Sequence, residues 1–242
     1  MNLLSCIIKE ETMTKRLGFT LAEVLITLSI IGVVAAMTIP TLISGYQEKV
    51  TVTKMKKIYS VLTNAYSLYK VENGEPIGLS ADENGAIKVA NIFKPYLKIA
   101  KDCGTGVGDG CIHTGEYLFK NGISSGDYSS YNEYYKLRLV DGSSLWFRAS
   151  NSAETNSYFT IFFDVNGEVG PNKWGHDLFD FRLYKNRGLL PVGIIAGDFS
   201  FENCAPANQN GYGCAAWVIQ KGNLDYLKCP NELTWTDNKC PN

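Results

Sequence analysis

The chain has 242 residues, 45% of them apolar and 19% charged, with a formal net charge of -1. This composition excludes a disordered chain, which would be poorer in apolar residues and more highly charged. A net charge near zero excludes a protein that holds nucleic acid by bulk charge. The length allows one domain or two small ones. The apolar residues are unevenly spread, because residues 19–43 carry a single charge, at Glu23.

The apolar stretch 19–43 is long enough to span a bilayer. As a helix it would reach about 37 Å, against a hydrocarbon core of about 30 Å. A secretory signal peptide fits less well, because its apolar run is shorter and ends at a small-residue cleavage site. A single-pass anchor is the simplest interpretation. Glu23 favours a more specific one, because an acidic side chain in an apolar helix costs on the order of 2.5–3.5 kcal/mol and usually has a partner.

Residues 15–23, Lys-Arg-Leu-Gly-Phe-Thr-Leu-Ala-Glu, strongly resemble the prepilin N-terminal motif of type IV pilins, type II secretion pseudopilins and competence pilins. In that family a membrane peptidase cuts after the glycine, which implies cleavage after Gly18 and N-methylation of Phe19. The resemblance also implies that the Glu23 carboxylate pairs with the N-terminal ammonium of a neighbouring subunit. An unpaired carboxylate in such a helix bundle would be costly. Gly32 and Pro40 also fall where many family members have Gly and Pro.

The resemblance implies an α+β fold in which a long N-terminal helix packs on an antiparallel sheet. We expect a cleaved leader (1–18), a membrane and assembly half of the helix (19–43), an amphipathic soluble half (44–72) and a globular head (73–242). The leader is long for the family, and it would shorten to the usual pattern if translation began at Met13. That start would also remove Cys6.

Beyond the apolar stretch, apolar residues recur at three-to-four-residue spacing from Ser44 to Glu72 and predict that the helix continues. Asn73-Gly74 should end it. A second short helix is expected around residues 89–97, interrupted by Pro95. Lysines at the start of the soluble half would oppose an outward-facing head by the positive-inside rule; they are Lys49, Lys54, Lys56 and Lys57.

The middle of the chain is typical of antiparallel strands. Asp141-Gly142 predicts a hairpin between strands 134–140 and 143–149. Asn166-Gly167 gives a second hairpin signal after strand 157–165, and residues 178–184 form a further candidate. In 135–140 apolar and polar residues alternate, which predicts one buried face.

Six cysteines follow residue 100 and form three sequence-near pairs, so three local disulfides are the simplest of many connectivities. They are Cys103, Cys111, Cys204, Cys214, Cys229 and Cys240. A zinc site is the rival, but the chain has no C-x-x-C and only two histidines, His113 and His176. Disulfides require an oxidising compartment, so this part should lie outside the cytoplasm. For the orientation of the head, the cysteines and the N-terminal motif outweigh the four lysines, which favour the opposite orientation.

The segment 164–177 is similar to the acidic, glycine-rich loop of major type II pseudopilins, which binds calcium. Calcium requires several oxygen ligands, and Asp164, Asn166 and Asp177 could supply three of them. The segment does not match the EF-hand template. The alternative is an Asn-Gly turn whose aspartates merely accept backbone hydrogen bonds.

No catalytic constellation is present, so we do not expect an enzyme. The leading hypothesis is a pilin or pseudopilin subunit of a filament. The resemblance implies three partners: a prepilin peptidase, other pilin subunits and an inner-membrane assembly platform. It places the head in the periplasm or outside the cell. One alternative is a minor tip subunit that binds a glycan, DNA or a secreted client, for which the tyrosine-rich stretch 126–135 is a candidate surface. Another is an anchored ectodomain that never polymerises.

Overall fold

The computed structural model describes residues 18–76, 79–150, 157–184, 186–195, 200–206, 209–237 and 239–241. The remainder of the expected leader, residues 1–17, lies outside the described part. The chain divides into two compact units, residues 1–46 and 47–242. The fold is α+β, with one long helix, an antiparallel sheet and disulfides toward the C-terminus, as predicted from the sequence.

The helix α1 spans Leu21–Asn73 and is therefore continuous through Pro40. In the described part of the first unit none of its side chains is buried. The large apolar side chains there are between 41% exposed, at Val24, and 87% exposed, at Phe19. Its hydroxyl side chains bond back to helix carbonyls, as when Ser29 Oγ donates to Leu25 O at 2.8 Å. The exposed apolar surface of this unit therefore indicates an interaction with a membrane or another protein rather than packing within its own fold.

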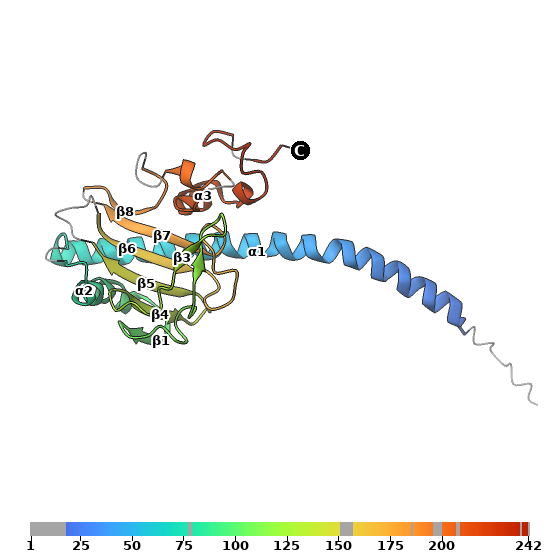
Figure 1. Ribbon diagram of the computed structural model, residues 1–242, viewed down its shortest axis with the longest axis horizontal. Coiled ribbons are helices and arrows are strands. Elements are labelled where there is room, and N and C mark those ends of the chain that lie inside the picture. Colours follow the sequence, from blue (N-terminus) through green and yellow to red (C-terminus); the bar gives the residue numbers. More distant parts are fainter. Residues whose placement is uncertain are drawn as a thin grey trace, which may run out of the picture. The chain divides into compact units, whose positions relative to one another are not determined.

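A six-stranded antiparallel sheet forms the centre of the second unit, in the order β1-β4-β5-β6-β7-β8 (Figure 1). Its strands are β1 Ile99–Gly104, β4 Tyr135–Leu139, β5 Ser144–Ala149, β6 Ser157–Asp164, β7 Leu178–Tyr184 and β8 Gly188–Pro191. A separate ribbon pairs β2 (Tyr117–Leu118) with β3 (Ser124–Gly126). The Asp141-Gly142 turn joins β4 to β5 as predicted, with Gly142 at φ +83°.

The helices of the second unit bury one face of this sheet. α1 contributes a stripe that includes Met55, Ile58 and Leu62, and α2 (Glu83–Phe93) packs on β5 and β4. The short helix α3 (Cys214–Lys221) lies against β7 and β8. The sheet contributes alternate residues of its four central strands to this core; they include Leu137, Leu145, Phe147, Phe159, Ile161, Phe163, Phe179, Phe181 and Leu183. Each such side chain contributes about 1.5–3 kcal/mol by leaving water.

The opposite face of the sheet is also buried, contrary to the prediction of a single buried face. Trp146 and Phe162 stack there with ring centroids 5.5 Å apart, within a cluster that includes Trp174. Lys136 points to this side and is fully buried. Its Nζ donates to Gly106 O at 2.8 Å and to Tyr131 O at 2.6 Å, and burial lowers its pKa to about 8. Strand β2 and loops, rather than helices, cover this face.

The tyrosine-rich stretch 126–135 is mostly buried: Tyr128 and Tyr134 belong to this cluster, and Tyr135 belongs to the core under the helices. Tyr128, Tyr134 and Tyr135 are each less than 9% exposed, and Tyr131 is 54% exposed. Most of these rings are therefore unavailable as a binding surface. Amino-acid composition alone could not distinguish an exposed binding loop from a loop whose tyrosines are buried in an aromatic core.

The structure corrects two local expectations. The short helix α2 begins at Glu83 and ends at Phe93, because the Asp82 side chain accepts a bond from Gly85 N at 2.9 Å and fixes an earlier start. A separate 3-10 turn, η1, covers Lys94–Tyr96. The strands β6 and β7 pair as neighbours, but residues 165–177 join them instead of a two-residue turn at Asn166-Gly167.

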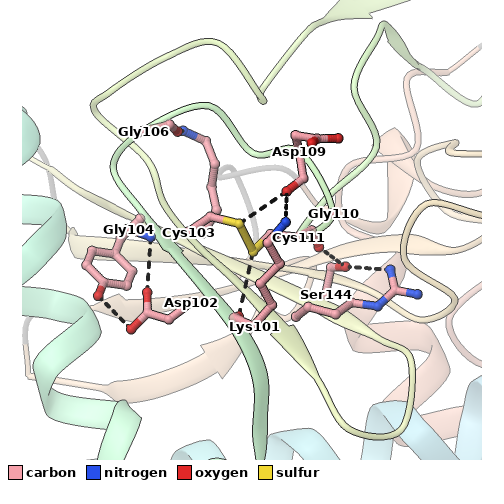
Figure 2. The surroundings of a disulfide bond; sticks show 12 residues. Lys101, Asp102, Cys103, Gly104, Gly106, Asp109, Gly110, Cys111 and Ser144 are labelled. Atoms are coloured by element: carbon pink, nitrogen blue, oxygen red, sulfur yellow. Dashed lines mark hydrogen bonds between the residues drawn. A yellow bond between two sulfur atoms is a disulfide. The ribbon is translucent and has the colours of Figure 1, made fainter.

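Three disulfides close short loops in the second unit: Cys103–Cys111, Cys204–Cys214 and Cys229–Cys240. The first joins β1 to a loop on the second face of the sheet (Figure 2). There Lys101 Nζ donates to Asp109 O at 2.6 Å, and the Ser144 hydroxyl donates to Cys111 O. The pairs are those that lie nearest in sequence. The expected disulfide chemistry is confirmed.

Candidate functional site

The residues of the N-terminal motif lie at the start of α1. Gly18, Phe19 and Thr20 are not helical, and the helix begins at Leu21. Thr20 and Glu23 form a reciprocal capping pair. Thr20 N and Thr20 Oγ1 each donate to Glu23 Oε2 at 2.8 Å, and Glu23 N donates to Thr20 Oγ1 at 3.2 Å. Sequence analysis assigned Glu23 a partner in a neighbouring subunit and missed this partner within the chain, which the T-x-x-E spacing could have revealed.

The two glycines of this segment are not required by the fold of a single chain. A Cβ built at Gly18 or at Gly32 would meet no atom within 4 Å. Neither glycine has a positive φ, so the backbone at both positions adopts a conformation that other residues also adopt. A requirement for glycine at either place must therefore come from another molecule, such as a peptidase or a packed helix.

A second candidate site lies where β6 ends. Asp164 is fully buried, and its Oδ1 accepts bonds from Asn166 N at 3.1 Å and Gly167 N at 2.9 Å. Its Oδ2 accepts the Tyr117 hydroxyl at 3.2 Å. Burial, together with the nearby carboxylate of Asp177, raises the pKa of Asp164 well above its usual range. The site therefore disfavours a bare negative charge at Asp164.

Asp177, just before β7, completes this acidic pair. It is 4% exposed, and its carboxylate accepts bonds from Asn172 N at 2.9 Å and Lys173 N at 2.7 Å. Burial raises its pKa, while a hydrogen bond with the Asn166 side chain opposes that shift. The three residues predicted from the sequence, Asp164, Asn166 and Asp177, thus lie together.

Two amide oxygens in the same loop have no hydrogen-bond partner in the described part of the chain. They are Oδ1 of Asn166 and Oδ1 of Asn172, and both are buried. Sequence analysis missed Asn172. Its left-handed backbone, φ +52°, is one that asparagine tolerates better than most residues, so an asparagine in this glycine-rich loop was the available signal. Among the described residues, no group of three or more His, Cys, Asp or Glu side chains is placed to hold a metal.

Comparison with known families identifies the N-terminal segment. A family model described as the prokaryotic N-terminal methylation motif matches residues 13–39. The chain carries a prepilin-type N-terminal segment. In the described part of the chain, one helix, α1, is long and apolar enough to cross a membrane. Together the prepilin-type segment and this helix indicate a single-pass membrane-anchored protein.

Curated relatives agree with the prepilin-type assignment. The type II secretion system core protein G of Escherichia coli (strain K12) is 39% identical over 59 residues, 24% of this chain and 40% of that protein. Core protein G of Vibrio cholerae serotype O1 (strain ATCC 39315 / El Tor Inaba N16961) is 38% identical over 63 residues, 26% of this chain and 42% of that protein. The match thus spans about two fifths of each relative's length. No solved structure matches the chain significantly.

Proposed function

We propose that this protein is a subunit of a type IV pilus-like filament or a type II secretion pseudopilus. The observation that carries the proposal is the prepilin-type segment at 13–39, which contains the start of a long helix whose large apolar side chains between residues 21 and 43 are exposed in the described part of the chain. Cleavage after Gly18 would expose Phe19 as the new N-terminus for methylation. The four proposed regions would then be a leader (1–18), an assembly half (19–43), a soluble half of the helix (44–72) and a head (73–242).

Assembly would proceed by side-to-side packing of the apolar halves of neighbouring helices. The Phe19 ammonium of one subunit would meet the Glu23 carboxylate of the next, which satisfies both charges in an apolar surrounding. Until then the Thr20 hydroxyl and amide supply donors to Glu23. The partners would be a prepilin peptidase, other pilin subunits and an inner-membrane platform, with the head outside the cytoplasm. Disulfides in the head support that orientation.

The test is a shearing assay on cells that make the protein together with its peptidase and assembly platform. A main subunit should be abundant in sheared filaments and depleted from the membrane. A minor tip subunit would be scarce there but present. A protein found only in the membrane fraction would be an anchored ectodomain, and that result would overturn the proposal.

We further propose that Asp164, Asn166 and Asp177 hold a calcium ion, with Asn172 as an additional oxygen ligand. A hard cation suits this donor set, because it would neutralise two buried carboxylates and engage the two unpaired amide oxygens. The bound ion would contribute charge neutralisation and a fixed loop between β6 and β7. Lys54 Nζ, on α1, donates to Val165 O at 2.8 Å, so a fixed loop would also brace the soluble half of the helix.

A further inference from the structure

A groove of about 560 Å³ opens in the C-terminal part of the second unit. Its volume falls in the range of about 300–1,000 Å³ that is typical of small-molecule sites. One wall is formed by residues 193–194 and 200–206 and the other by residues 230–235, and the lining is mostly apolar with a few polar groups.

Both walls of the groove are fixed by covalent and hydrogen bonds. The disulfide Cys204–Cys214 ties the first wall to α3, and Cys229–Cys240 closes the loop that contains the second. Lys120 Nζ donates to Ala205 O at 3.0 Å and to Pro206 O at 2.7 Å from behind the first wall. Because the groove is preformed, binding a ligand does not require these loops to be ordered, which lowers the entropic cost of binding.

Two aromatic rings line the groove, one from each wall. Phe201 and Trp235 meet edge to face, with centroids 5.5 Å apart. Both pack on the fully buried Trp217, on which Phe201 stacks at 4.4 Å. Phe201 and Trp235 are themselves half-buried, so they are held in place yet still reach the surface. Such rings match the C–H faces of sugar rings, which are apolar and flat.

Polar side chains stand at the rim of the groove, beside the aromatic rings. Glu202 and Asn231 are exposed, and Ser200 Oγ donates to Glu202 Oε2 at 2.7 Å. The Asn231 side chain has no hydrogen bond within the described part of the chain. A carboxylate accepts and an amide both donates and accepts, which is the combination that vicinal hydroxyl groups require.

The charge of the lining decides which ligand fits. The described lining contains no Lys, Arg or His, and it has one carboxylate, Glu202. Two cations lie near the groove without being part of its lining: Lys120, which is buried and donates to the wall carbonyls of Ala205 and Pro206, and Lys221, whose Nζ sits 4.8 Å from the Trp235 ring. An anionic ligand such as nucleic acid, a phospholipid headgroup or an acidic sugar would meet the Glu202 carboxylate and no cation in the described lining. We infer that the groove binds a neutral oligosaccharide.

The inference is tested with the purified full chain in detergent, titrated with maltohexaose, cellohexaose and chitohexaose. Trp235 is the natural reporter, because Trp146, Trp174 and Trp217 are at most 1% exposed. At least one of the three oligosaccharides should change the tryptophan fluorescence in a saturable way. Asn231→Ala and Glu202→Ala should each weaken that binding roughly three- to tenfold, as expected for one lost hydrogen bond.

Matched variants make the result decisive. Glu232→Ala removes an exposed carboxylate next to Asn231 but outside the groove, and it should leave the dissociation constant unchanged. Trp235→Phe keeps an aromatic ring but removes the fluorescent reporter, so its weakened binding is measured by titration calorimetry. Absence of saturable binding to all three oligosaccharides would overturn the inference. So would binding that neither rim variant affects, or tighter binding of a lysine-rich peptide that Glu202→Ala abolishes. None of these readouts depends on filament assembly.

Discussion

The Thr20 hydroxyl donates a 2.8 Å hydrogen bond to Glu23 Oε2, and the Glu23 amide donates back to the Thr20 oxygen at 3.2 Å. The carboxylate that would pair with a neighbouring ammonium in a filament is therefore already partnered in a single chain. Two roles of Glu23 can be separated, a local one at the start of α1 and an intermolecular one in assembly.

Substitution of Glu23 separates these roles. Glu23→Ala should be cleaved and inserted into the membrane yet be absent from sheared filaments. Glu23→Gln keeps an acceptor for Thr20 but lacks the charge for an ammonium, so it should fail in the same way. Immunoblots of membrane and sheared fractions give the answer. Normal incorporation of Glu23→Gln would show that the local capping pair, not the charge pair, is what assembly requires.

Substitution of Thr20 tests the local role by itself. Thr20→Val removes the hydroxyl that donates to Glu23, and the loss of a helix cap costs about 0.5–2 kcal/mol. The membrane-inserted subunit should therefore turn over faster, while Thr20→Ser should behave as the wild type. A pulse-chase measurement of subunit half-life distinguishes them. Equal half-lives for Thr20→Val and the wild type would remove the capping pair from the account.

The acidic pair predicts a stability that depends on calcium and on pH. Asp164→Asn preserves both backbone bonds to Oδ1, and the new amide can donate to Tyr117. At neutral pH with chelator, the variant should be more stable than the wild type because one buried charge is gone. Calcium at about 100 times its dissociation constant should stabilise the wild type by about 2.7 kcal/mol and leave Asp164→Asn unchanged.

The raised pKa of Asp164 fixes the direction in which the free energy of unfolding changes with pH. The folded-state pKa of Asp164 is raised, so the folded protein binds the proton more tightly than the unfolded chain does. Without calcium, the free energy of unfolding of the wild type, relative to Asp164→Asn, should rise as pH falls from neutral toward the unfolded pKa of about 3.9. Urea denaturation across that window measures it. Asp109→Asn, at an exposed aspartate, is the control. A difference that falls instead would contradict the assigned burial.

Glu48 links the soluble half of α1 to the C-terminal region of the head. Its Oε1 accepts the Leu224 amide at 2.9 Å, and its Oε2 pairs with Lys228 Nζ at 2.7 Å. The Lys228 side chain is 56% exposed, so the ion pair should contribute less than about 1 kcal/mol. Glu48→Ala should lower the free energy of unfolding by about 1–3 kcal/mol, because it also leaves the Leu224 amide unpaired. Lys228→Ala should cost less than Glu48→Ala; equal losses would assign the effect to the ion pair.

The central strands were predictable from sequence because their signals are local. The alternation in β4 and the Asp141-Gly142 turn that follows it lie within a few residues of one another, and the limits of β7 were predicted as observed. β8 and β1 escaped prediction. β8 is four residues long and ends in Pro191, while β1 is largely exposed and interrupted by register shifts. Such strands form because an adjacent strand supplies backbone hydrogen-bond partners, and the local sequence pattern does not show this pairing.

The candidate sites divide in the same way. Gly18, Phe19 and Glu23 could be proposed from sequence because the motif is contiguous, and Asp164 and Asn166 because they lie close to each other in sequence. Asn172 and the C-terminal groove were missed. Their chemistry depends on a left-handed residue in one case and on two disulfide-closed loops meeting in space in the other. The buried Lys136 was likewise unforeseen, since its partners are carbonyl oxygens of distant loops.

The most direct test of the account is N-terminal mass spectrometry of the mature protein from cells that contain a prepilin peptidase. The account predicts a chain that begins at Phe19 with one added methyl group on its amine. Gly18→Ala, a change that the fold itself tolerates, should leave the precursor uncut. A mature protein that still begins at Met1 or Met13 would contradict the proposal that this chain is a processed filament subunit.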